Sequence, residues 1–273
     1  MFKKIVIADS LAPLVNEIFN SYQNQPGQVL IMGAVLFAFQ IYGDFSGYSD
    51  VARGISKLLG IELMVNFNMP YFSRSIGEFW RRWHISLSTW FRDYVYIPLG
   101  GSREGKLIGI RNVFIIFVVS GLWHGANWTF IVWGLIHSLL FIPSFLVGNN
   151  RFYSGDLVNQ GSWLPSISSV LRLSMTFISV TLAWVFFRSE SLGNAIEYLT
   201  LIPQFSEVIE SGVVIGKKIP IYLILLIGIE YLLMRGIPKP IVRLRWFFYV
   251  LAGIIIYSSF LENQEAQFIY FQF

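Results

Sequence analysis

The sequence predicts an all-α, polytopic transmembrane protein with about six membrane segments and additional amphipathic helices at the interface. Three observations favour this fold class. Of the 273 residues, 55% are hydrophobic and only 13% are charged, whereas soluble domains carry about 25% charged residues. Long apolar runs recur along the chain, and open sheet edges cannot lie in lipid, so the runs are expected to be helices. The same composition excludes intrinsic disorder.

The membrane segments are predicted from these runs in order. Residues 5 to 20 precede them and are expected to form a short amphipathic helix at the membrane surface. The longest run is too long for one crossing, because a helix rises 1.5 Å per residue against a hydrocarbon core of about 30 Å. Gly121, Gly125 and Asn127 mark the place where it should break. The predicted spans are Val29 to Tyr42, two within Val113 to Val147, Ser169 to Phe187, Pro220 to Met234 and Trp246 to Leu261.

The basic residues predict the orientation of these spans. Lys and Arg concentrate in residues 44 to 111 and 235 to 245, so the positive-inside rule places both stretches on the cytoplasmic side. Residues 150 to 165 then form a cytoplasmic loop, and Lys217 and Lys218 on an outer loop count against this order. The net charge of +4 is not a nucleic-acid signature, since the basic residues do not share one soluble face.

The chain has no cysteine and three histidines, His84, His124 and His137. Disulfides, a thiol nucleophile and thiolate metal sites are therefore excluded, and no metal site is predicted. Any imidazole chemistry must use one of the three histidines.

Residues 79 to 96, FWRRWHISLSTWFRDYVY, predict one amphipathic helix at the membrane surface. His84 falls on its aromatic face rather than its arginine face. A histidine there must find a hydrogen-bond partner or stay neutral, so it is either a functional residue or part of an ordinary interfacial helix.

His124 lies in SGLWHGANW, well inside the apolar run. An ionisable side chain at this depth is a candidate functional site, with interhelical packing as the alternative. Gly121 and Gly125 allow close approach of another group, while the flanking Trp side chains provide walls and Asn127 a polar neighbour. His137 is expected to be a satisfied core or interfacial histidine.

A neutral histidine in a dry site can accept the proton of a hydroxyl that attacks an acyl carbon, which accelerates the reaction by about 10²–10⁴-fold. There is no serine in a G-x-S-x-G elbow and no cysteine, so direct transfer between two bound substrates is favoured over a covalent acyl-enzyme.

Two further motifs have simpler interpretations. In YGDFSGYSD, residues 42 to 50, Asp44 or Ser46 is expected to cap a following helix, with a donor-site role as the alternative. PLGGSREGK, residues 98 to 106, lacks Walker A spacing and is expected to be a basic turn.

These motifs resemble the membrane-bound O-acyltransferase family. The similarity rests on YGDFSGYSD, on NFNMPYFSRSIGEFWRRWHISLSTWFRDYVYIPLGGSR and on RNVFIIFVVSGLWHGANWTFIVWGLIHSL, with WVFFRSESLGNAIEYL and the terminal FIYFQF in support. The alginate O-acetyltransferase type is the most similar subgroup. The resemblance places the characteristic membrane histidine of the family at His124, and its second polar position, His or Asn by subfamily, at His84.

The resemblance implies a single transmembrane domain over residues 1–273 that transfers acetyl groups to hydroxyls of an exported polysaccharide, in the bacterial inner membrane. His124 would be the base and His84 its partner. The alternatives are D-alanyl transfer to teichoic acid and a scaffold subunit without activity; a transporter is disfavoured because only Glu230 is charged well inside a predicted span. The substrate-binding residues would be Trp83, Trp123, Asn127, Arg81 and Asp44.

No bound cofactor is expected. The acyl donor would be acetyl-CoA or an acyl-carrier thioester, attracted by Arg81, Arg82 and Arg92, although contact with anionic lipids explains these side chains equally well. The expected partners are the bilayer, the acyl donor and periplasmic or extracellular polysaccharide machinery. Family members usually carry about as much chain again before MFKKIVIADSLAP, so a missing N-terminal half is a further expected partner.

Overall fold

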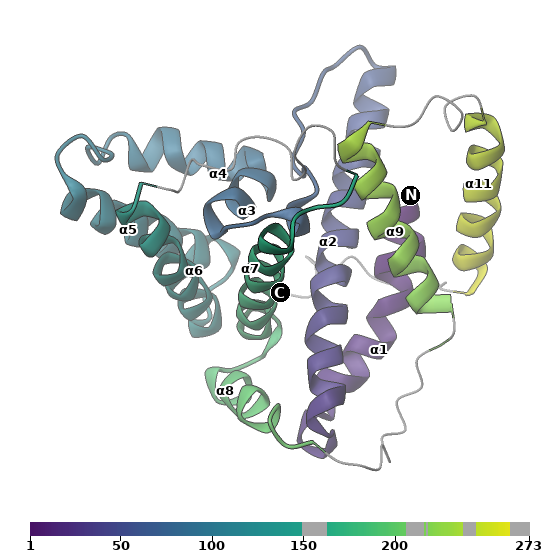
Figure 1. The fold of residues 1–273 in the computed structure, drawn as a ribbon, viewed down its shortest axis with the longest axis horizontal. Coiled ribbons are helices and arrows are strands. Elements are labelled where there is room, and N and C mark those ends of the chain that lie inside the picture. Colours follow the sequence, from purple (N-terminus) through teal and green to yellow (C-terminus); the bar gives the residue numbers. More distant parts are fainter. Residues whose placement is uncertain (149–162, 206–215, 217, 237–243, 263–273) are drawn as a thin grey trace. The chain divides into compact units, whose positions relative to one another are not determined.

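The computed structural model describes residues 1–148, 163–205, 216, 218–236 and 244–262 of the chain (Figure 1). All regular elements in these ranges are helices, which confirms the predicted fold class. The predicted loop at 150–165 lies largely outside these ranges, as do Lys217, Lys239, Arg243 and the terminal FIYFQF. The chain forms two compact units, residues 1–63 with 200–273 and residues 64–199. The single domain inferred from the family resemblance stays a prediction.

The first unit begins with the predicted N-terminal helix. A π-helical segment, η1 (Phe2–Ala8), continues into α1 (Asp9–Asn20), and both pack against α2 (Gly27–Leu58). The side chains of Val6, Leu11 and Val15 are at most 1% exposed. The apolar face of this helix is therefore buried in protein, where the sequence predicted a membrane surface.

Two glycines on α2 explain how closely η1 approaches. A Cβ atom on Gly43 would lie 2.7 Å from the carbonyl oxygen of Lys3, and one on Gly47 would lie 2.8 Å from the amide nitrogen of Lys4. Their spacing of four residues places both glycines on one face of α2. The glycines of YGDFSGYSD thus permit backbone-to-backbone packing.

The prediction that the first span ends near Tyr42, with Asp44 or Ser46 capping the next helix, is wrong. α2 runs unbroken for 32 residues. Asp44 is in its interior and 2% exposed, and the Lys4 ammonium lies 2.7 Å from its carboxylate. Because η1 supplies this cation, the carboxylate is tolerated within the helix instead of ending it.

The last two predicted spans are helices in the first unit, α9 (Lys218–Arg235) and α11 (Arg245–Glu262). α9 contains Lys218, Glu230 and Arg235, and it contacts η1. Tyr42 of α2 donates a hydrogen bond to Glu230, so this buried carboxylate is paired within the unit. Lys218 also donates to Glu262 of α11 over 2.6 Å.

The second unit contains the short helices η3 (Pro70–Phe72), α3 (Ile76–Arg82), α4 (Ile85–Phe91) and η4 (Arg92–Tyr96), followed by α5 (Lys106–His124), α6 (Trp128–Leu146) and α7 (Ile167–Arg188). α8 (Leu192–Leu201) follows across the unit boundary. The predicted break of the long apolar run is confirmed: Gly125 ends α5, and Asn127 caps α6.

α5 and α6 form a tight antiparallel hairpin. Gly121 lies against the backbone of Phe130, and Gly134 lies against the backbone of Phe117, so each helix contributes one glycine to the contact. α7 packs along the other side of α6. Among the described residues, α2, α5, α6 and α7 are the four helices long and apolar enough to cross a membrane.

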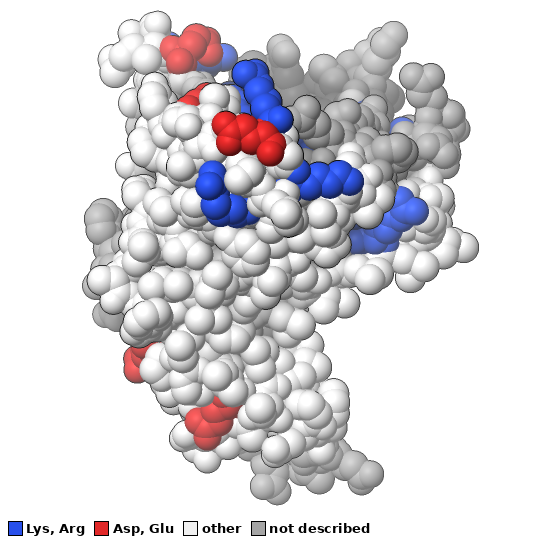
Figure 2. All heavy atoms as spheres, turned by 90° about the vertical axis from the view of Figure 1, so that its left-hand side faces the viewer, with Lys and Arg blue, Asp and Glu red and all other residues white. Residues whose placement is uncertain are grey.

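The predicted basic turn is present between η4 and α5. The buried Asn112 side chain donates to the carbonyl oxygens of Leu99 and Gly101, over 3.0 and 2.9 Å, and so fixes the turn. In Figure 2, Lys and Arg gather toward one end of the visible face, while much of the remaining surface is uncharged. This separation is what the positive-inside rule expects of a helix hairpin in a membrane.

Candidate active site

The segment that carries His84 differs from the prediction. Residues 79 to 96 do not form one helix, because α3 ends at Arg82 and α4 begins at Ile85. The backbone between them is satisfied by a distant stretch of chain: Asn68 donates to the carbonyl of Arg82 over 2.9 Å, and Ile85 donates to that of Asn66 over 3.0 Å. These bonds replace the missing helical ones, which makes the break possible.

His84 has the left-handed backbone conformation, with φ 42° and ψ 56°. Among the described residues, only Met69 is the other non-glycine at positive φ. Such residues cost free energy and are often found where a function requires a particular side-chain direction. The turn takes the imidazole out of the helical register and toward the end of α5.

The three histidines lie in one aromatic cluster in the second unit. Trp123 lies between the first two, with its ring centroid 6.1 Å from that of His84 and 5.0 Å from that of His124. Trp133 lies between the last two, at 5.3 Å from His124 and 5.0 Å from His137. Four segments therefore meet at the cluster: the α3–α4 break, the end of α5, α6 and, through Phe187 at 5.1 Å from His124, α7.

Accessibility falls along this row of rings. Trp123 is 56% exposed, His124 is partly buried and His137 is fully buried. A substrate can therefore reach the pair His84 and His124 beside Trp123, whereas His137 belongs to the closed end.

The imidazole of His84 is neutral at physiological pH. Burial disfavours the charged form and lowers its pKa to about 4. A neutral imidazole can accept a proton or a hydrogen bond through one nitrogen and donate through the other. This is the state that acid–base chemistry on a hydroxyl requires.

His137 is held by Trp80 of α3, whose indole N–H donates to Nδ1 over 3.3 Å. Because Nδ1 accepts this bond, the proton of the neutral ring is on Nε2. Nε2 is buried and has no hydrogen-bond partner in the described protein, and the same holds for the indole nitrogens of Trp133 and Trp184. His137 is thus a core histidine, as predicted, but only one of its nitrogens is satisfied.

Of the predicted substrate-binding residues, the structure brings two to the histidines. Trp123 separates His84 and His124, and Trp83 is buried, 5.1 Å from Trp184 between ring centroids. Asn127 is engaged in the fold, since it accepts from the amide of Thr129 and donates to the carbonyl of Glu190.

The other two lie away from this cluster. Arg81 is an exposed residue of α3, and Asp44 belongs to the first unit, where it pairs with Lys4.

Sequence reasoning missed two features that hold the site. Glu78 is 1% exposed and lies 2.9 Å from Arg82 and 3.3 Å from Arg74, so it ties α3 to the segment before it. The second is the wall formed by Trp133 of α6 and Trp184 of α7, whose rings stack at 5.6 Å. Its signal was the spacing of Thr129, Trp133 and His137, which recur every four residues and so share one face of α6.

The sequence of this region matches a family model. Residues 14–151 match the model of MBOAT, the membrane-bound O-acyltransferase family. The chain belongs to the membrane-bound O-acyltransferase family. All three histidines lie within the part that matches this family.

Curated members of the membrane-bound O-acyltransferase family and similar proteins align with most of the chain. It is 46% identical to a probable alginate O-acetylase of Pseudomonas syringae pv. tomato, over 71% of this chain and 35% of the relative. It is 42% identical to a peptidoglycan O-acetyltransferase of Helicobacter pylori, over 73% and 36%. A teichoic acid D-alanyltransferase of Bacillus subtilis is more distant, at 33% identity over 58% and 41%. The chain spans about a third of the length of the relatives most similar to it.

Proposed function

We propose that this chain carries the histidine site of a membrane O-acyltransferase that moves acetyl groups to hydroxyls of an exported or cell-surface polysaccharide. The observation that carries the proposal is the pairing of His84 and His124 on either side of the exposed Trp123. The identity of the chain to an alginate O-acetylase and a peptidoglycan O-acetyltransferase supports acetyl as the transferred group and a glycan as the acceptor.

In the proposed mechanism His124 is the general base. The acceptor hydroxyl attacks the carbonyl carbon of a thioester donor, and the His124 imidazole takes the hydroxyl proton as the new C–O bond forms. The tetrahedral intermediate then expels the thiolate, which receives the proton from the imidazolium. The products are the acetyl ester and the free thiol, and His124 is again neutral.

His84 is proposed to position the donor or the acceptor. Its neutral ring, held by the left-handed turn, has one N–H to donate and one nitrogen to accept. Trp83 and Trp123 supply apolar surface beside the reacting groups. Arg81, exposed on α3, and Arg82 and Arg92 would attract a donor that carries phosphate, either acetyl-CoA or an acyl-carrier thioester.

The basic end of the α5–α6 hairpin supports a cytoplasmic location for the donor side, and the inner membrane of a bacterium as the membrane. The acceptor would be delivered by polysaccharide machinery on the opposite side.

Ester analysis in cells tests the proposal. A strain lacking the gene would be complemented with the wild-type chain or with His124→Ala, and acetate released from the polysaccharide by mild base would be measured. We expect wild-type complementation to restore acetate and His124→Ala to lower it about 10²–10⁴-fold, because the general base is lost. Restored acetate with His124→Ala would refute the role of His124.

The released compound also decides between the alternatives. D-alanine in place of acetate would assign the chain to teichoic acid D-alanylation. A scaffold would be indicated if the ester were formed equally by His124→Ala and His84→Ala. Supplying labelled acetyl-CoA or a labelled acyl-carrier thioester to isolated membranes would identify the donor.

A further inference from the structure

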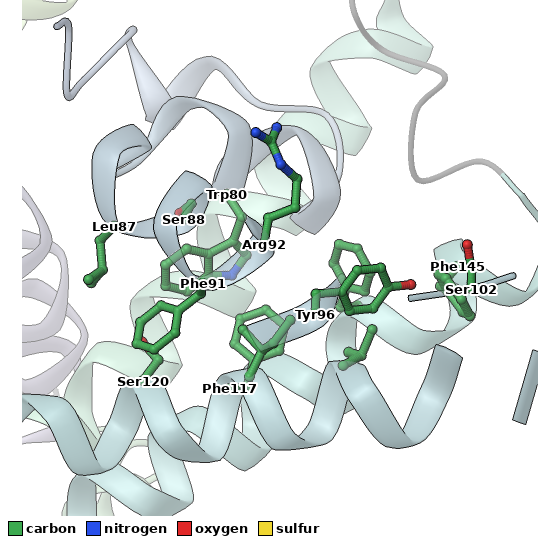
Figure 3. A pocket seen from close by; sticks show the side chains of 13 residues that line it. Trp80, Leu87, Ser88, Phe91, Arg92, Tyr96, Ser102, Phe117, Ser120 and Phe145 are labelled. Carbon is green, nitrogen blue, oxygen red and sulfur yellow. The ribbon is translucent and has the colours of Figure 1, made fainter. Parts of the chain in front are cut away.

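A cavity of about 220 Å³ lies in the second unit, between the α4–η4 segment and the α5–α6 hairpin (Figure 3). Neither His84 nor His124 lines it, so it is separate from the proposed acyl-transfer site. Most of its lining is aliphatic or aromatic: Trp80, Leu87, Phe91, Val113, Ile116, Phe117, Phe141 and Phe145. A cavity with such walls takes a hydrocarbon ligand in preference to a polar one.

The walls of this cavity are already in place. Val113 and Phe91 are at most 5% exposed, so their positions are set by packing. Phe145 lies against Gly109, where a Cβ atom would be only 2.5 Å from the ring. The Trp80 indole is fixed by its bond to His137. A preformed cavity costs a ligand less ordering free energy than one that must open.

Polar groups occur where η4 meets the cavity. Arg92, Tyr96 and Ser102 line it there, and Figure 3 shows the guanidinium of Arg92 directed away from Phe117 on the apolar floor. Asp93 accepts two hydrogen bonds from Arg92, at 2.7 and 3.1 Å, of the five that a guanidinium can donate.

The surroundings of this polar end are those of a lipid headgroup region. Trp90 and Tyr94 are 51% and 69% exposed, as expected of aromatic side chains at the membrane–water interface. Further exposed cations follow nearby in the chain, at Arg103, Lys106 and Arg111. The site therefore combines an apolar chamber, interfacial aromatic side chains and an excess of positive charge.

We propose that this cavity binds one acyl chain of an anionic phospholipid, with the phosphate beside Arg92. The hydrocarbon chain occupies the space between α4 and α5, and the glycerol region faces Tyr96 and Ser102. The proposal concerns lipid binding and is independent of the proposed acyl transfer.

Photolabelling in nanodiscs tests the proposal. The full chain would be reconstituted with phosphatidylglycerol carrying a diazirine on one acyl chain, irradiated and mapped by mass spectrometry of its peptides. We expect label on Val113, Ile116 or the facing residues of α6. Val113→Trp should lower this labelling about tenfold, because the indole fills the volume that the chain would bury.

Val119→Trp is the matched control, since Val119 is on the same helix, is 37% exposed and does not line the cavity. Equal labelling of the two variants would overturn the proposal. If Val113→Trp lowers the unfolding temperature, Ser120→Leu, a smaller change in the same lining, gives the decisive comparison.

The headgroup assignment has its own test. Phosphatidylcholine with the same photoreactive chain should label the cavity several-fold less than phosphatidylglycerol, and Arg92→Gln should reduce this difference. Equal labelling by the two lipids in the wild-type protein would refute the anionic headgroup.

Discussion

At the scale of single residues, the backbone of His84 is the most informative feature of the site. Replacing a residue in the left-handed conformation by alanine retains the backbone penalty, whereas glycine removes it. We therefore expect His84→Gly to be more stable than His84→Ala by about 1 kcal/mol, although both lose the imidazole. Thermal unfolding of the two purified variants measures the difference, and a more stable His84→Ala would show that the turn is not strained.

The same residue predicts a pH dependence of stability. The pKa of His84 is about 4 in the folded protein and would be near 6.5 once exposed by unfolding. Between these values the unfolded chain binds the extra proton, so stability falls as the pH is lowered from about 6.5 toward 4. The slope due to this residue is at most about 1.4 kcal/mol per pH unit. His84→Asn, which also tolerates the left-handed turn, should show a shallower slope; an identical slope would contradict the assignment.

Lys4 illustrates a charged residue whose value depends on its partners. Its ammonium lies 2.7 Å from both Asp9 and Asp44. Burial alone would lower the pKa of Lys4, but these two hydrogen bonds outweigh burial and raise it, so the side chain stays charged.

Removing this cation should destabilise the first unit. Lys4→Met leaves Asp44 buried without its counter-ion, which costs about 3–5 kcal/mol. The control is Lys57→Met on α2, where the side chain is 63% exposed and its ion pair with Glu62 is worth at most about 1 kcal/mol. Unfolding temperatures of the two variants make the comparison, and equal temperatures would show that the buried pairs contribute little.

At the scale of elements, the contact between α2 and η1 is tested through glycine. Gly43→Ala places a methyl group against the Lys3 carbonyl and should destabilise the protein by about 1–3 kcal/mol. Gly54→Ala on the same helix meets nothing within 4 Å and should be neutral or stabilising by up to about 1 kcal/mol. The two unfolding temperatures should therefore change in opposite directions; equal shifts would contradict the close packing.

The helix ends show which parts of the fold a sequence reveals. The break after His124 was predictable, because Gly125 and the capping residue Asn127 are local signals. The break at His84 was not, since it depends on hydrogen bonds from Asn66 and Asn68, which no local pattern of residues 79 to 96 contains. The length of α2 was missed for a related reason: the partner of Asp44 is Lys4, forty positions earlier in the chain.

The same distinction applies to the candidate site. The pairing of His84 and His124 was expected from the family resemblance, and the structure brings both to Trp123. The contributions of Trp133 and Trp184 were not expected, because ring contacts between α6 and α7 depend on how the two helices pack. Asp44, predicted to bind substrate, lies in a different unit from the histidines.

At the scale of the whole molecule, this division predicts that activity and stability are sensitive to different residues. His124→Ala changes a partly buried side chain of the second unit and should abolish acetylation with little change in unfolding temperature. Lys4→Met should lower the unfolding temperature of the protein while the three histidines are untouched. Measuring ester content and unfolding on the same preparations tests this separation, and a large loss of stability in His124→Ala would contradict it.

The bond between Trp80 and His137 also gives the protein an intrinsic optical reporter. The indole of Trp80 lines the hydrocarbon cavity on one side and donates to a buried imidazole on the other. Its fluorescence should therefore respond to a chain that enters the cavity, by a change in emission wavelength or quantum yield. Because the chain has nine tryptophans, the difference spectrum between the wild type and Trp80→Phe isolates this signal. Lipid occupancy then becomes observable in unlabelled protein, in real time.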